Sequence, residues 1–283
     1  GQYEILEASD SENLEAKLSI AKIYIDQKAF SKAIVKLEEI LGRAPYSDKI
    51  RYYLGAVYEE VKDYKNAITQ FLQIPVASSY YEDSVIHAAY LFKLIDDYPK
   101  AIATVENGIK MKDSYPQFYA LYAGFLDDLK EYDRAHSVLQ QAVQKFPKNA
   151  QLHFYIGSIN EKLGHLDQTE VAMKKVLEID ENHVQAMNYL AYAYAEQGKS
   201  LEEAERMARK ALDLKPQDGY VMDTLGWVLY KQGKIEEAIR KLEAAQKVEP
   251  KESIIAEHLG DAYFKMQLSD KAKKMYQRAT EIE

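Results

Sequence analysis

GYVMDTLGWVLYKQGKIEEAIRKLEAAQKVEPKE, residues 219–252, contains the pattern that decides the fold. It predicts a first helix, a tight turn at Gly233, a second helix and a stop at Pro250, because glycine suits a turn and proline ends a helix. The same unit of 34 residues returns along the chain. Its starts are Leu14, Asp48, Glu82, Pro116, Ala150, Val184, Gly219 and Ser253, and the step changes once, by one residue, in the turn at residues 198–200.

Two positions of this unit carry small side chains. Position 20 is alanine except for Thr169, and position 8 is alanine or glycine in every copy: Ala21, Gly55, Ala89, Ala123, Gly157, Ala191, Gly226 and Gly260. Two helices joined by a short turn reach the close end of the roughly 8–10 Å range of interaxial distances only where the side chains at their crossing are small. The pattern therefore predicts a series of tightly packed helical hairpins.

In length and residue pattern, this unit resembles the tetratricopeptide repeat. The resemblance covers residues 14–283 and implies an all-α fold, a right-handed superhelical solenoid of eight tandem helix-turn-helix repeats. Such stacks bury the apolar face of each unit against its neighbours. We expect units 1–4 in residues 14–149 and units 5–8 in residues 150–283, as one continuous solenoid, and we interpret residues 1–13 as the tail of a truncated preceding repeat.

Local departures from the pattern predict where the repeats differ. Pro75 interrupts the second helix of the second unit, so we expect that helix to end early and a longer connection to follow. Gly164, Gly198 and Gly233 occupy position 15, between the two helices of their units. A left-handed turn residue is expected there, because glycine adopts that conformation at little cost.

The composition restricts the possible partners and chemistry. The net charge of −8 argues against nucleic acid, which requires clustered lysine and arginine. Cysteine is absent, which excludes disulfides, thiol nucleophiles and cysteine-bound metals and fits a reducing cytosol or an envelope compartment. No stretch approaches the roughly 20 apolar residues of a membrane span. No signal peptide is visible, although the chain begins at Gly1 without methionine.

Motifs for catalysis are also missing. The string Gly198-Lys199-Ser200 resembles the end of a phosphate-binding loop, but the glycine that such a loop needs five residues earlier is Ala193. The six histidines are scattered, without the spacing of a zinc site. The sequence therefore predicts a protein that is not an enzyme, with no catalytic residues, no cofactor and no metal.

The resemblance implies a binding surface, because first helices line the concave face of tetratricopeptide repeats and positions 2, 5, 9 and 12 project into it. Aromatic anchors in a polar surround are typical of protein recognition. The candidate partner-binding residues at these positions are Tyr52, Tyr90, Phe154, Tyr192, Tyr220, Asp223, Trp227, Tyr230, Glu257, Asp261 and Phe264. Their acidity favours a protein or peptide segment that is basic or neutral, with apolar anchors. Packing between units is the alternative for each ring, since the chain has 23 tyrosines.

Residues 186–267 show a closer resemblance. The strings AMNYLAYAYAEQGKSLEEAERMARKAL, VMDTLGWVLYKQGKIEEAIRKL and EHLGDAYFKMQ are similar to the end of bacterial cell-envelope repeat proteins. Some of these are lipid-anchored adaptors, including ones that deliver substrates to a processing protease. The resemblance implies a bacterial envelope adaptor, in the periplasm or membrane-associated through a lipid anchor outside this chain, with a cytoplasmic location as the alternative.

Two functional hypotheses follow from the sequence. The first is a non-enzymatic scaffold that binds a partner segment in its concave groove. The second is a structural module that forms homo-oligomers through the open ends of the solenoid, because the last apolar face of a repeat stack otherwise meets water.

Overall fold

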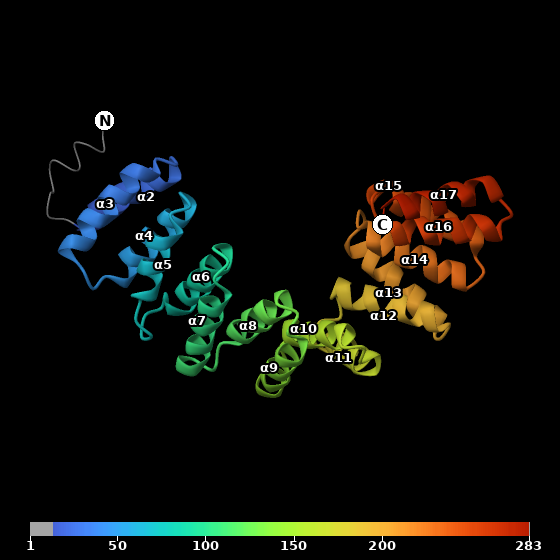
Figure 1. Ribbon diagram of the computed structural model, residues 1–283, viewed down its shortest axis with the longest axis horizontal. Coiled ribbons are helices and arrows are strands. Elements are labelled where there is room, and N and C mark those ends of the chain that lie inside the picture. The colour runs from blue at the N-terminus through green and yellow to red at the C-terminus, as the bar shows by residue number, and fades with distance from the viewer. Residues whose placement is uncertain (1–13, 283) are drawn as a thin grey trace. The chain divides into compact units, whose positions relative to one another are not determined.

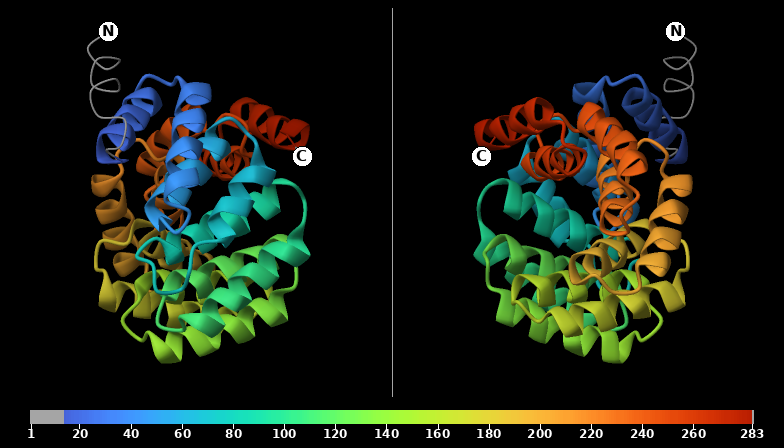
Figure 2. Two further views of the ribbon diagram at one scale, coloured as in Figure 1. Left: turned by 90° about the vertical axis from the view of Figure 1, so that its left-hand side faces the viewer. Right: turned by 90° about the vertical axis from the view of Figure 1, so that its right-hand side faces the viewer.

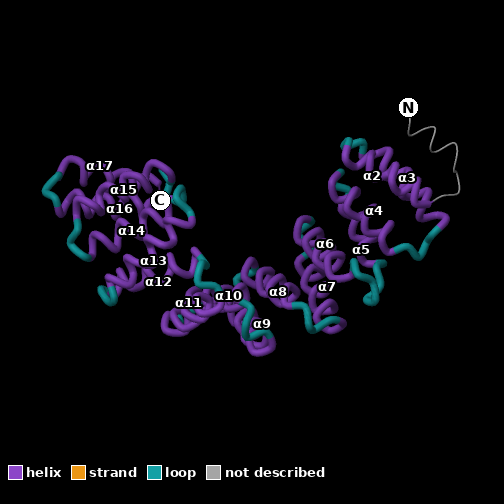
Figure 3. The backbone as a smooth tube through the Cα atoms, turned by 180° about the vertical axis from the view of Figure 1, so that it is seen from behind, coloured by secondary structure: helices purple, strands orange, loops and turns teal. Residues whose placement is uncertain are grey.

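The computed structural model describes residues 14–282, and every regular element in that range is an α-helix (Figure 3). The all-α fold predicted from the sequence is confirmed, while the prediction for residues 1–13 lies outside the described residues. The helices are α2 (Leu14–Asp26), α3 (Phe30–Arg43), α4 (Asp48–Glu60), α5 (Tyr64–Leu72), α6 (Tyr81–Leu94), α7 (Tyr98–Met111), α8 (Pro116–Asp128), α9 (Tyr132–Lys145), α10 (Ala150–Lys162), α11 (Leu166–Ile179), α12 (Val184–Gln197), α13 (Leu201–Leu214), α14 (Gly219–Lys231), α15 (Ile235–Val248), α16 (Ser253–Lys265) and α17 (Ser269–Ile282).

The helices follow the phase of the sequence repeat (Figure 1). Seven of the eight predicted first helices begin at the predicted residue, and α6 begins at Tyr81, one residue before Glu82. Every second helix begins at position 17 of its unit. The first and second helices of a unit pack against each other, as α14 does against α15 and α16 against α17. The predicted helix-turn-helix repeats are therefore confirmed in the described part of the chain.

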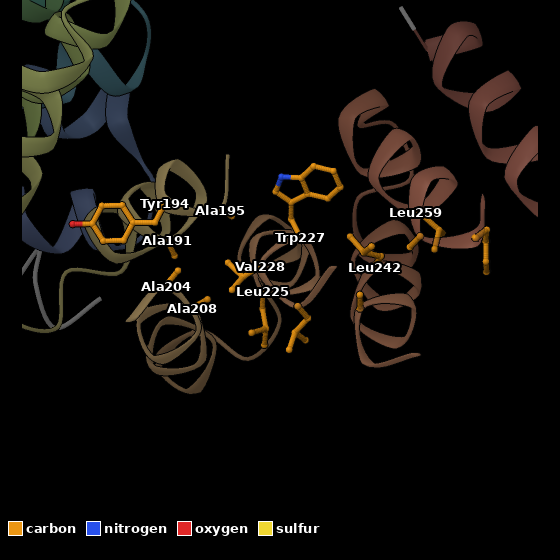
Figure 4. Packing of buried hydrophobic residues seen from close by; sticks show 14 of the residues in the cluster. Ala191, Tyr194, Ala195, Ala204, Ala208, Leu225, Trp227, Val228, Leu242 and Leu259 are labelled. Carbon is orange, nitrogen blue, oxygen red and sulfur yellow. The ribbon is translucent and has the colours of Figure 1, made fainter. Parts of the chain in front are cut away.

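Small residues do lie at the crossings. A Cβ atom placed on Gly226 would lie 2.7 Å from Cγ of Leu242, and one on Gly55 would lie 2.8 Å from Cε1 of Phe71. Both distances are well below van der Waals contact, so the first and second helices of these units approach as closely as glycine permits. Figure 4 shows the same principle with alanine, where Ala191 of α12 faces Ala204 of α13.

Position 15 is left-handed in all eight described turns. The three predicted glycines have positive φ, for example +80° at Gly233. The other five turns place a larger residue in the same conformation: Lys28, Lys62, Asp96, Lys130 and Gln267. An L-residue with a side chain pays roughly 1–2 kcal/mol for a left-handed backbone. The turn geometry is thus imposed by the packing of the hairpin, and glycine is favourable there without being required.

The second repeat, residues 48–81, contains the predicted early end of a helix. Helix α5 ends at Leu72 and has 9 residues, against 14 in α3 and α7. The connection through Pro75 then runs to Tyr80, the residue before α6. Ile74 and Ser78 are buried within this connection, so it packs on the helices beside it.

Contacts divide the chain into two compact units, with the division between Ala142 and Val143 inside α9. Figure 2 shows the helical pairs of the chain from two further sides. In the second unit, α14 contacts both α12 and α16, so three first helices lie in a row. That row carries most of the candidate partner-binding residues.

Candidate partner-binding surface

Helix α14 is the centre of the row. Asp223, Trp227 and Tyr230 lie along one side of it, because residues three and four positions apart share a helix face. The indole of Trp227 stacks on the phenol of Tyr230, with ring centroids 4.8 Å apart and planes at 4°. The structure thus brings together three of the candidate partner-binding residues predicted from the sequence.

A histidine from the next repeat completes this cluster. The imidazole of His258 on α16 stacks on Trp227 with a centroid distance of 4.0 Å and planes at 14°. Its Nδ1 atom forms a hydrogen bond with the Asp223 carboxylate, 3.0 Å from Oδ1 and 3.1 Å from Oδ2. All three side chains are buried, so the hydrogen bond and the stacking both join α14 to α16.

The indole of Trp227 is also tied to α12. Its Nε1 atom donates a hydrogen bond of 2.7 Å to Oε1 of Glu196. Lys231 lies with its Nζ atom 4.6 Å from the centroid of the indole and 3.3 Å from the same carboxylate oxygen. The hydrogen bond from Trp227, and then the charge of Lys231, lower the pKa of Glu196 against the opposing effect of burial.

These contacts give Trp227 and Asp223 a clear internal role. Their exposed fractions are only 7% and 5%, and their polar atoms are bonded to α12 and α16. Tyr230 is half-buried, and burial followed by the charge of Asp261 raises its pKa. The cluster therefore holds three first helices in register, and the surface that a partner can reach lies around it.

A pocket of about 370 Å³ lies between α10, α12 and α14, the last two of which belong to the row. It brings together Phe154, Tyr192 and Tyr220, three residues predicted from different repeats. Burial, followed by the charges of nearby carboxylates including Glu196, raises the pKa of the Tyr192 phenol. The complete lining is Phe154, Ser158, Glu161, Met173, Val184, Gln185, Asn188, Tyr189, Tyr192, Asp218, Tyr220 and Val221.

The charged residues in this lining are acidic. Asp218 caps α14, because its Oδ1 atom accepts hydrogen bonds from the backbone N–H groups of Tyr220 and Val221. Tyr220 is 48% exposed, and its hydroxyl donates a hydrogen bond of 2.7 Å to Glu252. That hydrogen bond, with a smaller effect of burial, raises the pKa of Tyr220 to about 12. The pocket thus offers aromatic surface and hydrogen-bond acceptors.

The remaining predicted residues of the second unit lie on α16. Glu257 is exposed, whereas Asp261 accepts a hydrogen bond of 2.7 Å from the hydroxyl of Tyr276. Phe264 is 67% exposed and lines a different depression, formed by α16 and α17. These three residues are not part of the pocket lining.

Tyr52 and Tyr90 belong to the first unit. Tyr52 packs in an aromatic cluster, with its ring 5.0 Å from that of Tyr80 and 5.8 Å from that of Phe71. Tyr90 is exposed and contacts the edge of Phe125 at 6.0 Å. Both residues therefore belong to the first unit, whereas the pocket belongs to the second unit.

Sequence reasoning missed three residues that contribute to this surface. His258, Asn188 and Tyr189 were left out of the predicted set, although Asn188 stands at position 5 of its unit and the other two at position 6. In the structure, His258 at position 6 faces the preceding first helix, as its hydrogen bond with Asp223 shows. Polar or aromatic residues at position 6 were the available signal.

A family model of the tetratricopeptide repeat matches residues 128–283, more than half of the chain. The chain belongs to the tetratricopeptide repeat family. This tetratricopeptide repeat chain is 26% identical over 216 residues to a TPR repeat-containing protein of Pseudomonas aeruginosa, covering 76% of the chain and 36% of the relative. It is 30% identical over 121 residues to the type IV pilus assembly protein PilF of the same organism, covering 42% of the chain and 48% of PilF. The chain thus spans less than half the length of either relative.

Solved tetratricopeptide repeat structures share the fold. A repeat protein from Parabacteroides merdae has a TM-score of 0.59 and 18% identity, covering 72% of this chain and 80% of that one. YrrB, described as a TPR protein with an unusual peptide-binding site, has a TM-score of 0.52 and 17% identity, covering 63% and 92%. MamA of Desulfovibrio magneticus RS-1 has a TM-score of 0.52 and 16% identity, covering 59% and 94%.

Residues 14–282 show neither a metal-binding group nor a membrane-spanning helix. No group of three or more histidine, aspartate or glutamate side chains converges there in a way that could hold a metal ion. None of the helices in this range combines the length and the apolar character needed to cross a membrane.

Proposed function

We propose that this tetratricopeptide repeat chain is a non-enzymatic scaffold that binds a segment of another protein on the first helices of its second unit. The observation that carries the proposal is the pocket in which Phe154, Tyr192 and Tyr220 converge from three successive repeats. Its volume of about 370 Å³ is in the range of ligand pockets and suits one or two side chains of an extended segment.

The chemistry of the surface suits a basic or neutral segment with apolar anchors. Aromatic rings supply contact area at a low entropic cost, and the charged residues of the lining, Glu161 and Asp218, are acidic. The net charge of −8 adds long-range attraction for a basic partner.

The proposal includes a role as an adaptor in the bacterial envelope, such as one that serves a processing protease. Its support is the resemblance of residues 186–267 to envelope repeat proteins and the similarity to PilF, whose name describes type IV pilus assembly. YrrB, which has the same fold, is described as having a peptide-binding site.

Site-specific crosslinking tests the scaffold. A photoreactive phenylalanine analogue is placed at Tyr220, an exposed residue of the pocket lining, or at Val171, an exposed position on α11, in cells that make the chain. We expect one defined protein to be crosslinked at Tyr220 and not at Val171. Its yield should fall when Phe154→Ala is added, while far-UV circular dichroism remains unchanged. Equal labelling at both positions, or no crosslink at Tyr220, contradicts the proposal.

A second candidate function is self-assembly through the α16–α17 face. A depression of about 530 Å³ with a largely apolar lining lies there, formed by Phe264, Ala272 and Tyr276 with Ser269, Lys273, Gln277 and Thr280. Exposed apolar surface of this kind is typical of interaction sites. A second copy of the chain would cover it.

Sedimentation velocity over a concentration series separates the two functions. Self-assembly predicts a mass that rises with concentration and a Phe264→Ser variant that remains monomeric. A chain that is monomeric at the highest concentration refutes self-assembly, and leaves the crosslinking experiment to decide on the scaffold.

A further inference from the structure

The pocket between α10, α12 and α14 contains a carboxylate that has no cation beside it. The side chain of Glu161 on α10 is exposed and forms no hydrogen bond or ion pair with any residue of the described range. Partial desolvation in the pocket raises the pKa of Glu161, and the charge of Lys162 only partly opposes this effect. No ion pair with a described residue therefore neutralises this carboxylate.

Elsewhere in the second unit, the chain supplies such a charge itself. Glu170 forms an ion pair of 2.9 Å with Lys199, whose Nζ atom lies 5.2 Å from the ring centroid of Tyr194. Lys231 stands in the same relation to Glu196 and its neighbouring indole, at 3.3 Å and 4.6 Å. Both sites combine a carboxylate, an aromatic ring and a cation that contacts both, an arrangement favoured by ion pairing and cation–π attraction.

At Glu161 the carboxylate and the rings are present without the cation. Glu161 and Tyr189 both line the pocket. Burial, and then the negative charge of Glu161, raise the pKa of the Tyr189 phenol. Phe154 and Tyr192 also line the pocket. No lysine, arginine or histidine is among the lining residues, so the lining itself does not supply the cation.

A second acceptor lies in the same lining. The Oδ1 atom of Asn188 is buried and has no hydrogen-bond partner among residues 14–282. An unsatisfied buried acceptor destabilises a folded state, so a donor that reaches this amide would be favoured.

We propose that this pocket binds an arginine side chain of the partner segment, with its guanidinium on the carboxylate of Glu161. The inference rests on the proposed scaffold function and specifies the partner residue that the pocket recognises. A guanidinium has five donors in a plane, so it can serve Glu161 and Asn188 together while stacking on the ring of Tyr189. An ammonium group is a compact point charge and cannot stack in this way.

Binding of a small probe tests this directly, without knowledge of the partner. Met173 lines the pocket, and its methyl group in a ¹³C-methyl-methionine-labelled chain is a local reporter in NMR spectra. N-acetyl-arginine amide should shift this resonance in a saturable way, with a dissociation constant on the order of millimolar for a ligand of this size. N-acetyl-citrulline amide has nearly the same shape without the charge and should bind at least about tenfold more weakly. N-acetyl-lysine amide should also bind more weakly than the arginine probe.

Matched variants assign the effect to Glu161. Glu161→Gln keeps the size of the side chain and should weaken the arginine probe about tenfold, as expected when a charge-assisted hydrogen bond is lost. Glu178→Gln, on the exposed end of α11 where Glu178 pairs with Lys175, should leave the affinity unchanged. Because the pKa of Glu161 is raised above 4.5, arginine binding should already weaken as the pH falls toward that value from above.

Several results would overturn the inference. These are a Met173 resonance that does not move at about 100 mM probe, equal affinities for arginine and citrulline, tighter binding of lysine than of arginine, or an unaltered affinity in Glu161→Gln. The scaffold function has a separate test, because a protein crosslinked at Tyr220 would still establish a partner when the arginine probe fails. Failure of both experiments would reject the function together with the inference.

Discussion

Replacing the glycine at position 8 should have opposite effects in two repeats. In Gly226→Ala, the new Cβ atom would lie 2.7 Å from Cγ of Leu242, 2.9 Å from its Cδ2 and 3.3 Å from its backbone nitrogen. Leu242 is fully buried, and its branch point cannot move without shifting α15. In Gly157→Ala, the closest atom is the terminal methyl carbon of Met173, at 2.8 Å, which lies at the end of a flexible side chain.

The expected magnitudes follow from two opposing contributions. Alanine stabilises a helix interior by about 1 kcal/mol relative to glycine. Overpacking of a rigid core costs roughly 1–3 kcal/mol, which exceeds that gain. We therefore expect Gly226→Ala to lower the free energy of unfolding by about 1 kcal/mol. Gly157→Ala should raise it by roughly 0.5 kcal/mol, because Met173 can change its rotamer.

Urea unfolding provides the assay. Trp227 is the single tryptophan and stands next to Gly226, so its fluorescence follows the repeat that contains the first substitution. Far-UV circular dichroism follows both variants over the whole chain, which matters because repeat arrays can unfold in more than one step. A Gly226→Ala variant as stable as the parent, or a Gly157→Ala variant that loses as much as Gly226→Ala, would refute the packing argument.

Three further predictions concern pH, a turn and the buried cluster. Burial raises the pKa of Glu205, but hydrogen bonds from Lys234 and two other donors outweigh it and lower the pKa to about 2. The stabilisation from Glu205 is therefore present above pH 4.5 and lost as the pH falls toward 2. At pH 7, the free energy of unfolding of Glu205→Gln, measured by urea titration, should be roughly 1–2 kcal/mol below that of the parent, and this difference should be smaller at pH 3. Gly233→Ala should lower the thermal midpoint, because a left-handed alanine costs roughly 1–2 kcal/mol, and an unchanged midpoint would contradict the turn geometry. Asp223→Ala should cost about 1–3 kcal/mol by leaving His258 without its buried partner, and adding His258→Phe should recover part of that loss in the same fluorescence assay.

The periodic small residues were sufficient to predict the fold. Small side chains at positions 8 and 20 allow the two helices of a repeat to cross closely at one place only. The start of each first helix could therefore be predicted to within one residue. The exception is α6, which begins at Tyr81. The preceding connection through Pro75 carries its own packing, with Ser78 buried, and this lies outside the repeat pattern.

The site was less predictable than the fold. Position in the repeat identified the helix face of Trp227 and Asp223, but it could not show that both are bonded to neighbouring first helices. Those bonds depend on which residue the adjacent repeat offers, here His258 and Glu196, and such pairs are separated by about one repeat in sequence. The pocket likewise is lined by residues from several repeats, so the sequence of a single repeat does not show it.

The shortened α5 has a practical consequence for labelling. The connection of residues 73–80 leaves Ala77 and Ser79 exposed, although Ile74 and Ser78 anchor it on the helices beside it. An epitope or a fluorescent tag inserted at Ala77 would lengthen a connection that follows a shortened helix, so the helices on both sides would keep their own packing. The first unit therefore contains its own attachment point for imaging or immobilisation, on a different unit from the pocket.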